Sequence, residues 1–158
     1  MFHVALVEPE IPPNTGNVAR LCAAVRTPLH IVGQAGFRLD DRAVRRAGLD
    51  YWPEVELRRH RDLDALRAAL GPPSRLVYFT TKARASYLEW AFAPNDCLVF
   101  GPETRGLPDE LLRANSESCV TLPMLNPKVR SLNLATAVAV ALYEALRQVG
   151  ALGRPGRV

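Results

Sequence analysis

The chain of 158 residues contains little cysteine, almost no lysine and no long apolar segment. Its three cysteines, Cys22, Cys97 and Cys119, are odd in number and lack the CxxC spacing of redox and zinc motifs. Each stands in an apolar run, so we expect three reduced thiols in the core. The longest apolar run, Ala135 to Tyr143, has nine residues and is too short to cross a bilayer, so no membrane partner is expected.

Several motifs of common function classes are also missing. His3, His30 and His60 are isolated from one another in the sequence and from the cysteines, so we predict no metal site. No basic region or cleavage site of a signal peptide follows Met1, and we expect a cytoplasmic protein. The chain lacks both GxGxxG and GxxxxGK[ST], which disfavours dinucleotide-binding folds and phosphate-binding loops.

What the chain does contain is arginine, which supplies eighteen of the twenty basic residues. Two clusters stand out, one at Arg42, Arg45 and Arg46 and one at 58–61, and the formal net charge is +4. Guanidinium groups bind phosphate through two hydrogen bonds and stack on bases, so the surface is compatible with a nucleic-acid partner. The same clusters are also typical of solvated helix faces or of genomic composition, and the charge alone leaves both interpretations open.

Short apolar segments alternate with helical patterns along the whole chain. This order predicts an α/β fold with a mostly parallel sheet and helices on both faces, in one domain over residues 1–150 with a loose tail at 151–158. Asn14 or Thr15 is expected to cap the first helix, and Asp62 the third. The predicted strands are 2–7, 29–32, 76–80, 97–100 and 120–122, and the predicted helices are 14–26, 40–47, 62–70, one from 108, and 132–148.

Parallel sheets of this kind bind ligands at the carboxyl ends of their strands. We therefore expect a site formed by the segments after Val7, Thr80, Phe100 and Leu122. The loop 101–106 is the most informative of these segments, because a Gly-Pro pair stops an apolar strand and presents one carboxylate, Glu103, on a stiff connection. A plain strand-to-helix connection with a solvated glutamate is the alternative.

Four further polar residues lie beside these strand ends. Arg20 points away from the apolar stripe of its helix and faces either solvent or a ligand. Asn14 and Ser131 are most simply interpreted as helix caps. Asn133 stands in the first turn of a helix that is apolar on almost every side, so its amide should bond to something specific. Such a helix must be buried between the sheet and another surface, for which a second copy of the chain is the obvious candidate.

Three motifs together resemble a known family. They are NTGNxxR at 14–20, FGPETRGLP at 100–108 and PMxxxxxRSLNL at 123–134. This set is similar to the three motifs of the SPOUT RNA 2′-O-methyltransferases, and within that superfamily the chain looks most like the small enzymes that methylate the ribose of the tRNA wobble nucleotide, a cytidine or modified uridine at position 34. The resemblance covers about residues 1–150.

The resemblance implies properties that composition could not show. It implies a carboxyl-terminal trefoil knot, S-adenosylmethionine as cofactor, the tRNA anticodon stem-loop as substrate and an obligate homodimer. The implied cofactor contacts are Phe79, Thr80, Gly101, Leu122, Met124, Ser131 and Leu132. The residues implied around the target ribose are Asn14, Arg20, Glu103, Ser131 and Asn133.

The chemistry of methyl transfer suits these residue types. A sulfonium methyl is already activated, so the protein mainly has to align the ribose oxygen, the methyl group and the sulfur and to exclude water. The family assigns Arg20 the activation of the hydroxyl. A guanidinium holds its proton firmly and is a poor base. The role that we rank first for Arg20 is therefore to bind a phosphate or ribose oxygen and to steer the hydroxyl. The same reaction at another RNA position and a non-catalytic RNA-binding module on the same fold are the alternatives.

Overall fold

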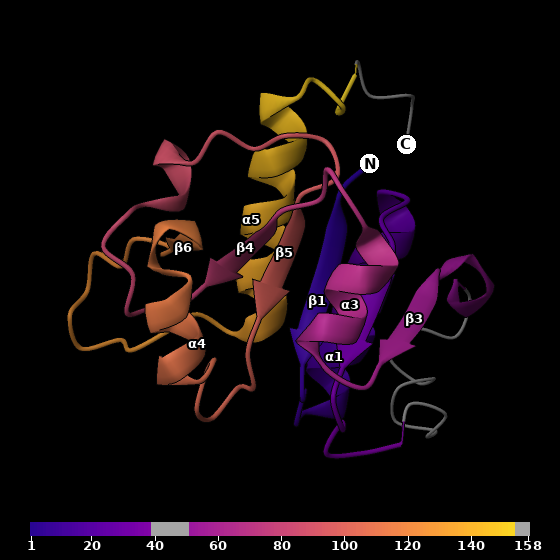
Figure 1. Ribbon diagram of the computed structural model, residues 1–158, viewed down its shortest axis with the longest axis horizontal. Coiled ribbons are helices and arrows are strands. Elements are labelled where there is room, and N and C mark those ends of the chain that lie inside the picture. Colours follow the sequence, from indigo (N-terminus) through magenta and orange to yellow (C-terminus); the bar gives the residue numbers. More distant parts are fainter. Residues whose placement is uncertain (39–50, 154–158) are drawn as a thin grey trace.

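A computed structural model describes residues 1–38 and 51–153 of the chain. These residues form a six-stranded, entirely parallel sheet in the order β3-β2-β1-β5-β4-β6 (Figure 1). The predicted parallel α/β architecture is therefore confirmed. The strands are β1 (His3–Val7), β2 (Leu29–Val32), β3 (Leu57–His60), β4 (Leu76–Phe79), β5 (Cys97–Phe100) and β6 (Cys119–Val120).

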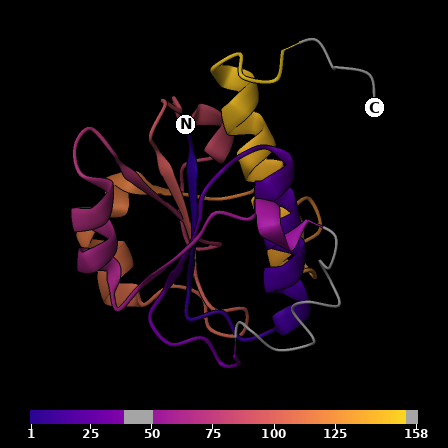
Figure 2. The same cartoon turned by 90° about the vertical axis from the view of Figure 1, so that its right-hand side faces the viewer.

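Helices cover both faces of the sheet, as Figure 2 shows with the sheet seen on edge. One face carries α1 (Pro12–Ala24) and α5 (Leu134–Gln148), which pack against each other, and the other carries α3 (Leu63–Leu70) and α4 (Asp109–Ala114). Short 3₁₀ turns occur at η1 (Trp52–Glu54), η2 (Tyr87–Glu89) and η3 (Ser116–Ser118). Because both faces are covered, β2 and β5 are buried along their whole length, which explains their continuous apolar or uncharged sequences.

Alternate residues of each strand build two separate cores. In β1, Val4 and Leu6 point toward the α1 and α5 side, while Ala5 lies in the second cluster together with Leu66 of α3 and Leu112 of α4. All of these side chains are almost or fully inaccessible to solvent. The two-sided packing fixes the strand register, since a shift by one residue would exchange the two cores.

The first helix begins earlier than predicted. It starts at Pro12, with two prolines in the first turn, where the fixed φ of proline suits a helix and the missing N–H costs nothing. Ile11 occupies the N-cap position without a side-chain hydrogen bond, so the prediction that Asn14 or Thr15 caps this helix is wrong. Both are buried inside the helix.

The predicted cap of α3 is confirmed, because the Asp62 carboxylate accepts a hydrogen bond from Ala65 N at 2.8 Å.

Strand β3 was not predicted. Its residues are Leu57, Arg58, Arg59 and His60, so three of the four are polar and the segment resembles a charged surface stretch. As an edge strand it pairs with β2 alone, and an edge strand needs little apolar surface. The predicted helix at 40–47, the cluster Arg42, Arg45 and Arg46, and the end of the tail from residue 154 lie outside the described residues.

The prediction for the cysteines is confirmed, since Cys22, Cys97 and Cys119 are all free and buried. Burial raises the pKa of the Cys22 thiol to about 12, and it also raises the pKa of the other two thiols. Within residues 1–38 and 51–153, no helix combines the length and the hydropathy that a membrane crossing requires.

His3, His30 and His60 are far apart in the sequence, but the fold brings their rings together. His3 Nδ1 lies 3.1 Å from His30 Nε2, and His30 Nδ1 lies 2.8 Å from His60 Nε2. The three residues belong to the adjacent strands β1, β2 and β3, which lie next to one another only after the sheet has formed. Because His30 uses its two nitrogens toward different partners, the rings form a linear chain, which we call the histidine chain. In the described part of the protein, no group of three potential ligands is arranged to hold a metal ion.

Candidate functional site

The loop between β5 and α4 folds back tightly on itself. Gly106 N donates to Pro102 O at 2.8 Å, and Gly106 has a φ of +68°, which glycine adopts without strain. A Cβ atom on Gly101 would lie only 2.4 Å from Leu107 N, so no other residue fits at this position. Gly101, which directly follows β5, is therefore required by the closure of the loop, which holds the loop backbone at the end of the sheet.

Glu103 joins this loop to the start of α1. Its Oε2 accepts a hydrogen bond from Glu10 N at 2.8 Å, and its Oε1 accepts one from Ile11 N at 3.1 Å. A carboxylate is favourable at a helix N-terminus, because it satisfies free N–H groups and interacts with the helix dipole. Glu103 is thus engaged with backbone at the position where the first and second motifs meet.

Asn14 and Asn133 extend this contact into the third motif. Asn14 Nδ2 donates to Glu103 Oε1 at 3.3 Å, and Asn133 Nδ2 donates to Asn14 Oδ1 at 2.9 Å. A carboxylate only accepts hydrogen bonds, so Glu103 orients the amide of Asn14, which in turn orients that of Asn133. We call these three residues the asparagine chain. It connects positions that are 89 and 119 residues apart in the sequence.

Asn133 also caps the last helix. Its Oδ1 accepts from Ala135 N at 2.9 Å and from Thr136 N at 3.3 Å, and α5 begins at Leu134. The expectation that its amide bonds to something specific is confirmed by the contact with Asn14. The interpretation of Ser131 as the cap is wrong, because Ser131 lies two residues too early and is exposed.

A hydrogen bond and an ion pair that the sequence did not reveal hold the same loops together. Thr104 Oγ1 donates to the Glu10 carboxylate at 2.8 Å, and Arg105 forms an ion pair with Glu8. Glu8 has a φ of 44°, which is unusual for a residue with a side chain. Thr104 and Arg105 belong to the same motif as Glu103, so their place in the motif was the available signal.

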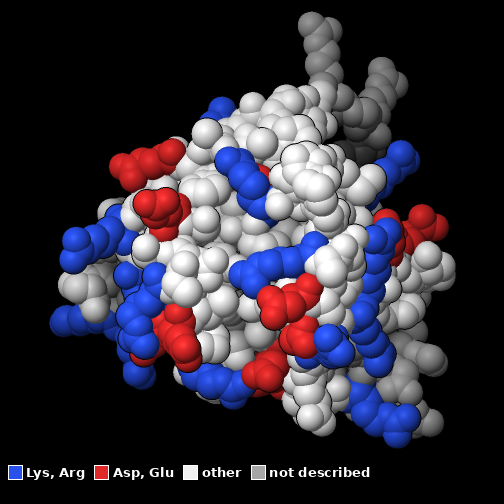
Figure 3. All heavy atoms as spheres, in the orientation of Figure 1, with Lys and Arg blue, Asp and Glu red and all other residues white. Residues whose placement is uncertain are grey.

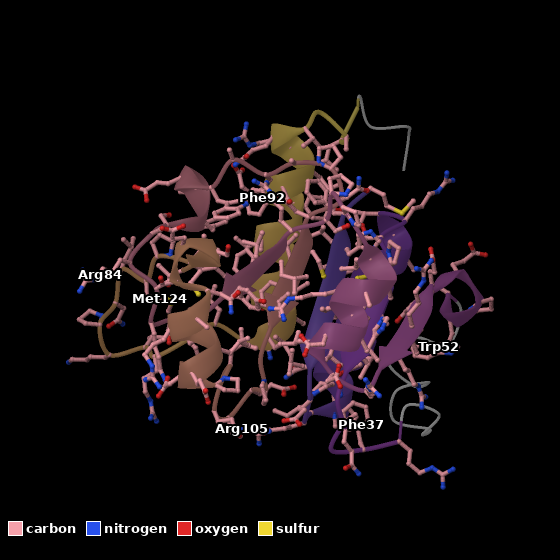
Figure 4. All side chains as sticks on the ribbon, viewed as in Figure 1. Phe37, Trp52, Arg84, Phe92, Arg105 and Met124 are labelled. Atoms are coloured by element: carbon pink, nitrogen blue, oxygen red, sulfur yellow. The ribbon has the colours of Figure 1, made fainter. Side chains whose placement is uncertain are left out.

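A cavity of about 680 Å³ opens beside the asparagine chain, within the size range of small-molecule sites. It is formed where segments after β4, β5 and β6 meet at the carboxyl edge of the sheet. All the predicted cofactor residues line it, namely Phe79, Thr80, Gly101, Leu122, Met124, Ser131 and Leu132. Asn14, Glu103 and Asn133 line it too, so one cavity brings together four of the five residues predicted around the ribose. Figure 4 labels Met124 beside α4.

The cavity wall is apolar on one side and polar on another. The rings of Phe79 and Phe100 stack with their centroids 4.6 Å apart and lie beside Leu122. Lys82 and Arg130, which were not predicted, also line the cavity; the Lys82 ammonium is paired with Asp109, whereas Arg130 forms no ion pair with the described residues. Lys82 directly follows a pair of threonines after β4, and this position at a strand end was the available signal. Such a mixed wall suits a ligand that has both an aromatic part and a charged polar part.

Arg20 does not line this cavity. It stands six residues after Asn14 on α1, about 9 Å further along the helix axis. Its guanidinium carbon lies 5.2 Å from the ring centroid of Tyr51, a cation–π contact, and it borders a different cavity of about 370 Å³. A single chain therefore does not bring Arg20 together with the other predicted residues.

The fold and the cavity define a class, that of parallel α/β proteins which bind a small ligand at the carboxyl ends of their strands. A model of the family described as the SpoU rRNA Methylase family matches residues 1–143. The chain therefore belongs to this family of methyltransferases.

Relatives and solved structures agree with this assignment. The tRNA (cytidine(34)-2'-O)-methyltransferase of Burkholderia ambifaria is 54% identical over 95% of this chain and 97% of its own length. A solved structure concerned with the 2-OH methylation of C/U34 on tRNA superimposes with a TM-score of 0.89, at 49% identity, covering 96% of this chain and 97% of the other. The SpoU methyltransferase AviRb from Streptomyces viridochromogenes, in complex with AdoMet, has a TM-score of 0.80 at 27% identity over 94% of this chain and 60% of its own.

Proposed function

We propose that this chain transfers a methyl group from S-adenosylmethionine to the ribose 2′-hydroxyl of nucleotide 34 in the tRNA anticodon loop, where the nucleotide is a cytidine or a modified uridine. Relatives named for this reaction match nearly the whole chain. The observation that carries the proposal is the convergence of Asn14, Glu103 and Asn133, from three distant motifs, at the edge of one cavity.

The cavity fits S-adenosylmethionine by size and by the chemistry of its wall. The stacked pair Phe79 and Phe100 and the side chains of Leu122 and Met124 suit the flat adenine, whereas backbone groups around Gly101 suit the polar parts. A cofactor bound here supplies a methyl group activated by a positively charged sulfur. AdoMet is bound by the SpoU methyltransferase AviRb, a relative with the same fold.

The asparagine chain positions groups for the reaction. Each of its two amide nitrogens carries a second N–H, which no other described residue engages, and both residues line the cavity. These N–H groups are held by bonds that begin at a carboxylate, so they are fixed before the substrate arrives. In the proposed mechanism they hold oxygen atoms of the target nucleotide, and Ser131 offers a hydroxyl at the same wall. Fixed donors of this kind reduce the reorganisation that alignment would otherwise require.

The structure supports a second copy of the chain as the source of Arg20. On α5, the apolar side chains Val140 and Tyr143 are 40% and 46% exposed, although the same helix buries Val138, Ala141, Leu142, Ala145 and Leu146 in the core. We propose that this surface lies in a homodimer, as does the neighbouring helix α1 that carries Arg20. In such a dimer Arg20 of one copy completes the cavity of the other and steers the ribose hydroxyl. The carboxyl-terminal trefoil knot and a cytoplasmic location belong to the same proposal.

Mixed dimers test the role of Arg20. The variants Arg20→Ala and Asn133→Ala are each expected to be inactive, but mixing and reassociating them should restore about a quarter of the wild-type activity, because half of the dimers then contain one intact site. Mixtures that stay inactive while dimers form would rule out a site shared between copies. Normal turnover by Arg20→Ala would remove Arg20 from the mechanism.

The reaction itself is tested with labelled S-adenosylmethionine and unmodified tRNA, followed by digestion to nucleosides. The proposal predicts label on a 2′-O-methylated nucleoside from position 34. Label on a ribose elsewhere would indicate another target, and RNA binding without label transfer would indicate a non-catalytic binding module.

A further inference from the structure

A further cavity, of about 880 Å³, lies beside the cofactor cavity at the carboxyl edge of the sheet. Its wall consists of the segment Gly33 to Arg38, which follows β2, together with Ile31, Arg59 and Arg61. We call it the arginine cavity, after Arg38, Arg59 and Arg61. Nothing in the proposed methyl-transfer chemistry uses it.

The arginine cavity carries excess positive charge. No acidic residue is found among its described lining residues. Within the described part of the chain, Arg59 forms no ion pair, whereas Arg61 Nε lies 3.0 Å from Asp62 Oδ2. The Arg61 side chain is 86% exposed, and an ion pair so open to water binds weakly. Figure 3 shows basic side chains along the side of the molecule where β3 lies.

Backbone contacts place this charge next to the methyl-transfer site. Gly36 N donates to Pro9 O at 2.9 Å, and Glu8 N donates to Val32 O at 2.8 Å. The loop from Glu8 to Ile11 therefore has the arginine cavity on one side and the loop of Glu103 and Arg105 on the other. In Figure 4, Phe37 and Arg105 both lie at the end of the molecule toward which the strand arrows point. A single loop thus separates the two cavities.

The acidic residues of that separating loop do not cancel the charge of the arginine cavity. The Glu8 carboxylate is paired with Arg105, and the Glu10 carboxylate accepts from Thr104 and lies 3.6 Å from Arg105. One guanidinium, that of Arg105, faces both carboxylates and offsets one of their two negative charges, and neither carboxylate belongs to the lining of the arginine cavity. Arg59 is therefore available for an anion that approaches from solvent, and Arg61 can join it because its pair with Asp62 is open to water.

We propose that the arginine cavity binds the phosphate backbone of the substrate RNA, next to the nucleotide whose ribose enters the cofactor cavity. This inference rests on the proposed function and names the surface that holds its substrate. Planar guanidinium groups bind phosphate through two parallel hydrogen bonds, and several in one hollow match the repeated charge of a nucleic-acid strand. Phe37 lines the same cavity and offers a ring on which an unstacked base of the anticodon loop can pack.

The double variant Arg59→Gln/Arg61→Gln tests this surface. Binding of an anticodon stem-loop RNA and methyl transfer to tRNA are measured for the wild type and the variant. We expect the Kd for RNA and the KM for tRNA to rise about tenfold, with kcat and the Kd for S-adenosylmethionine within twofold of the wild type. The slope of log K against log salt should become shallower by about one to two, because fewer counterions are released.

The matched control is Arg84→Gln/Arg113→Gln. Both arginines are exposed, form no ion pair with the described residues and belong to segments near β6, at the opposite edge of the sheet from β3. This control should bind RNA nearly as the wild type does. Equal weakening in both double variants would show that only the net charge matters, and unchanged binding by Arg59→Gln/Arg61→Gln would also overturn the inference.

Two additional measurements separate this inference from the proposed function. The single variant Arg59→Lys keeps the charge but loses the fork of donors, so it should bind RNA with intermediate affinity even if the double variant folds poorly. A wild-type protein that methylates no tRNA would defeat the proposed function. A wild type that methylates tRNA while its arginine variants bind normally would defeat this inference alone.

Discussion

Two hydrogen-bonded chains of side chains connect distant parts of this molecule, and they differ in what surrounds them. The histidine chain crosses three neighbouring strands, and its central residue His30 is inaccessible to solvent. The asparagine chain runs from the last helix to the loop after β5 and borders a cavity of about 680 Å³. The first lies in the sheet and the second at its carboxyl edge.

This difference in surroundings indicates that the histidine chain contributes to stability and the asparagine chain to function. Each nitrogen of His30 is used within the histidine chain, so nothing is left for a ligand. In the asparagine chain, both amide nitrogens keep a second N–H at a cavity wall, and the carboxylate that anchors them is bonded to backbone. We therefore expect changes in the histidine chain to alter mainly the free energy of unfolding, and changes in the asparagine chain to alter mainly methyl transfer.

Replacing the anchor of the asparagine chain should give the largest effect. In Glu103→Gln, one acceptor oxygen becomes a donor that faces the N–H groups of Glu10, Ile11 or Asn14. We expect methyl transfer to fall about 100-fold and the free energy of unfolding to drop by about 2 kcal/mol. Steady-state kinetics and denaturant unfolding measure the two quantities. Glu117→Gln, at an exposed glutamate of η3, is the control and should change neither; if Glu103→Gln behaved like it, the carboxylate would not anchor the site.

Acid should weaken the histidine chain. Burial, and then the charges of His3, His60 and Arg58, lower the pKa of His30 from 6.5 to about 3. Burial likewise lowers the pKa of His3 and of His60. Below about pH 6.5 the histidines of the unfolded chain bind protons, whereas those of the folded chain stay neutral. The free energy of unfolding therefore has its full value above pH 6.5 and falls as the pH decreases toward 3.

Between pH 7 and pH 5 the expected loss in the free energy of unfolding is about 2 kcal/mol. Urea unfolding across this range measures it. His30→Leu should be less stable at pH 8 but should show a flatter dependence on pH. If the free energy of unfolding depended on pH equally in the variant and the wild type, His30 would not be the source of the pH dependence.

The smallest effect is expected at His60, the end of the histidine chain on the edge strand β3. His60→Ala removes the partner of His30 Nδ1, which costs about 1 kcal/mol of unfolding free energy. The kcat for methyl transfer should stay within twofold, because no described contact joins His60 to the cofactor cavity. Thermal melting and kinetics on the same preparation measure both quantities. A large fall in kcat without a change in melting temperature would contradict the claim that the histidine chain contributes to stability and not to methyl transfer.

Local patterns in the sequence predicted the parallel sheet, the cap at Asp62 and the strand ends that form the cavity. They could not predict β3, because an edge strand with Arg58, Arg59 and His60 buries too little to show a pattern. The histidine chain was missed for another reason. His3, His30 and His60 meet only through the pairing order of the strands, which sequence spacing does not contain.

The sequence also could not predict which contacts the residues of the site make. The motifs supplied the residues, but Asn14 was interpreted as the cap of α1 and Ser131 as the cap of α5. Ile11 occupies the N-cap position of α1, whereas Asn133 caps α5 and donates to Asn14. Cap preferences of asparagine and serine are similar, so only the geometry distinguishes them. The position of Arg20 away from the cavity likewise follows from the helix direction of α1, and not from its motif.

The most direct test of the account is the rate of methyl transfer to tRNA by Asn133→Ser, measured with saturating S-adenosylmethionine and RNA. Serine keeps a cap oxygen for α5 but loses the amide that donates to Asn14. We predict a rate about 100-fold below that of the wild type, with a melting temperature within a few degrees of it. A rate within twofold of the wild type in a folded protein would contradict the claim that the asparagine chain performs the positioning.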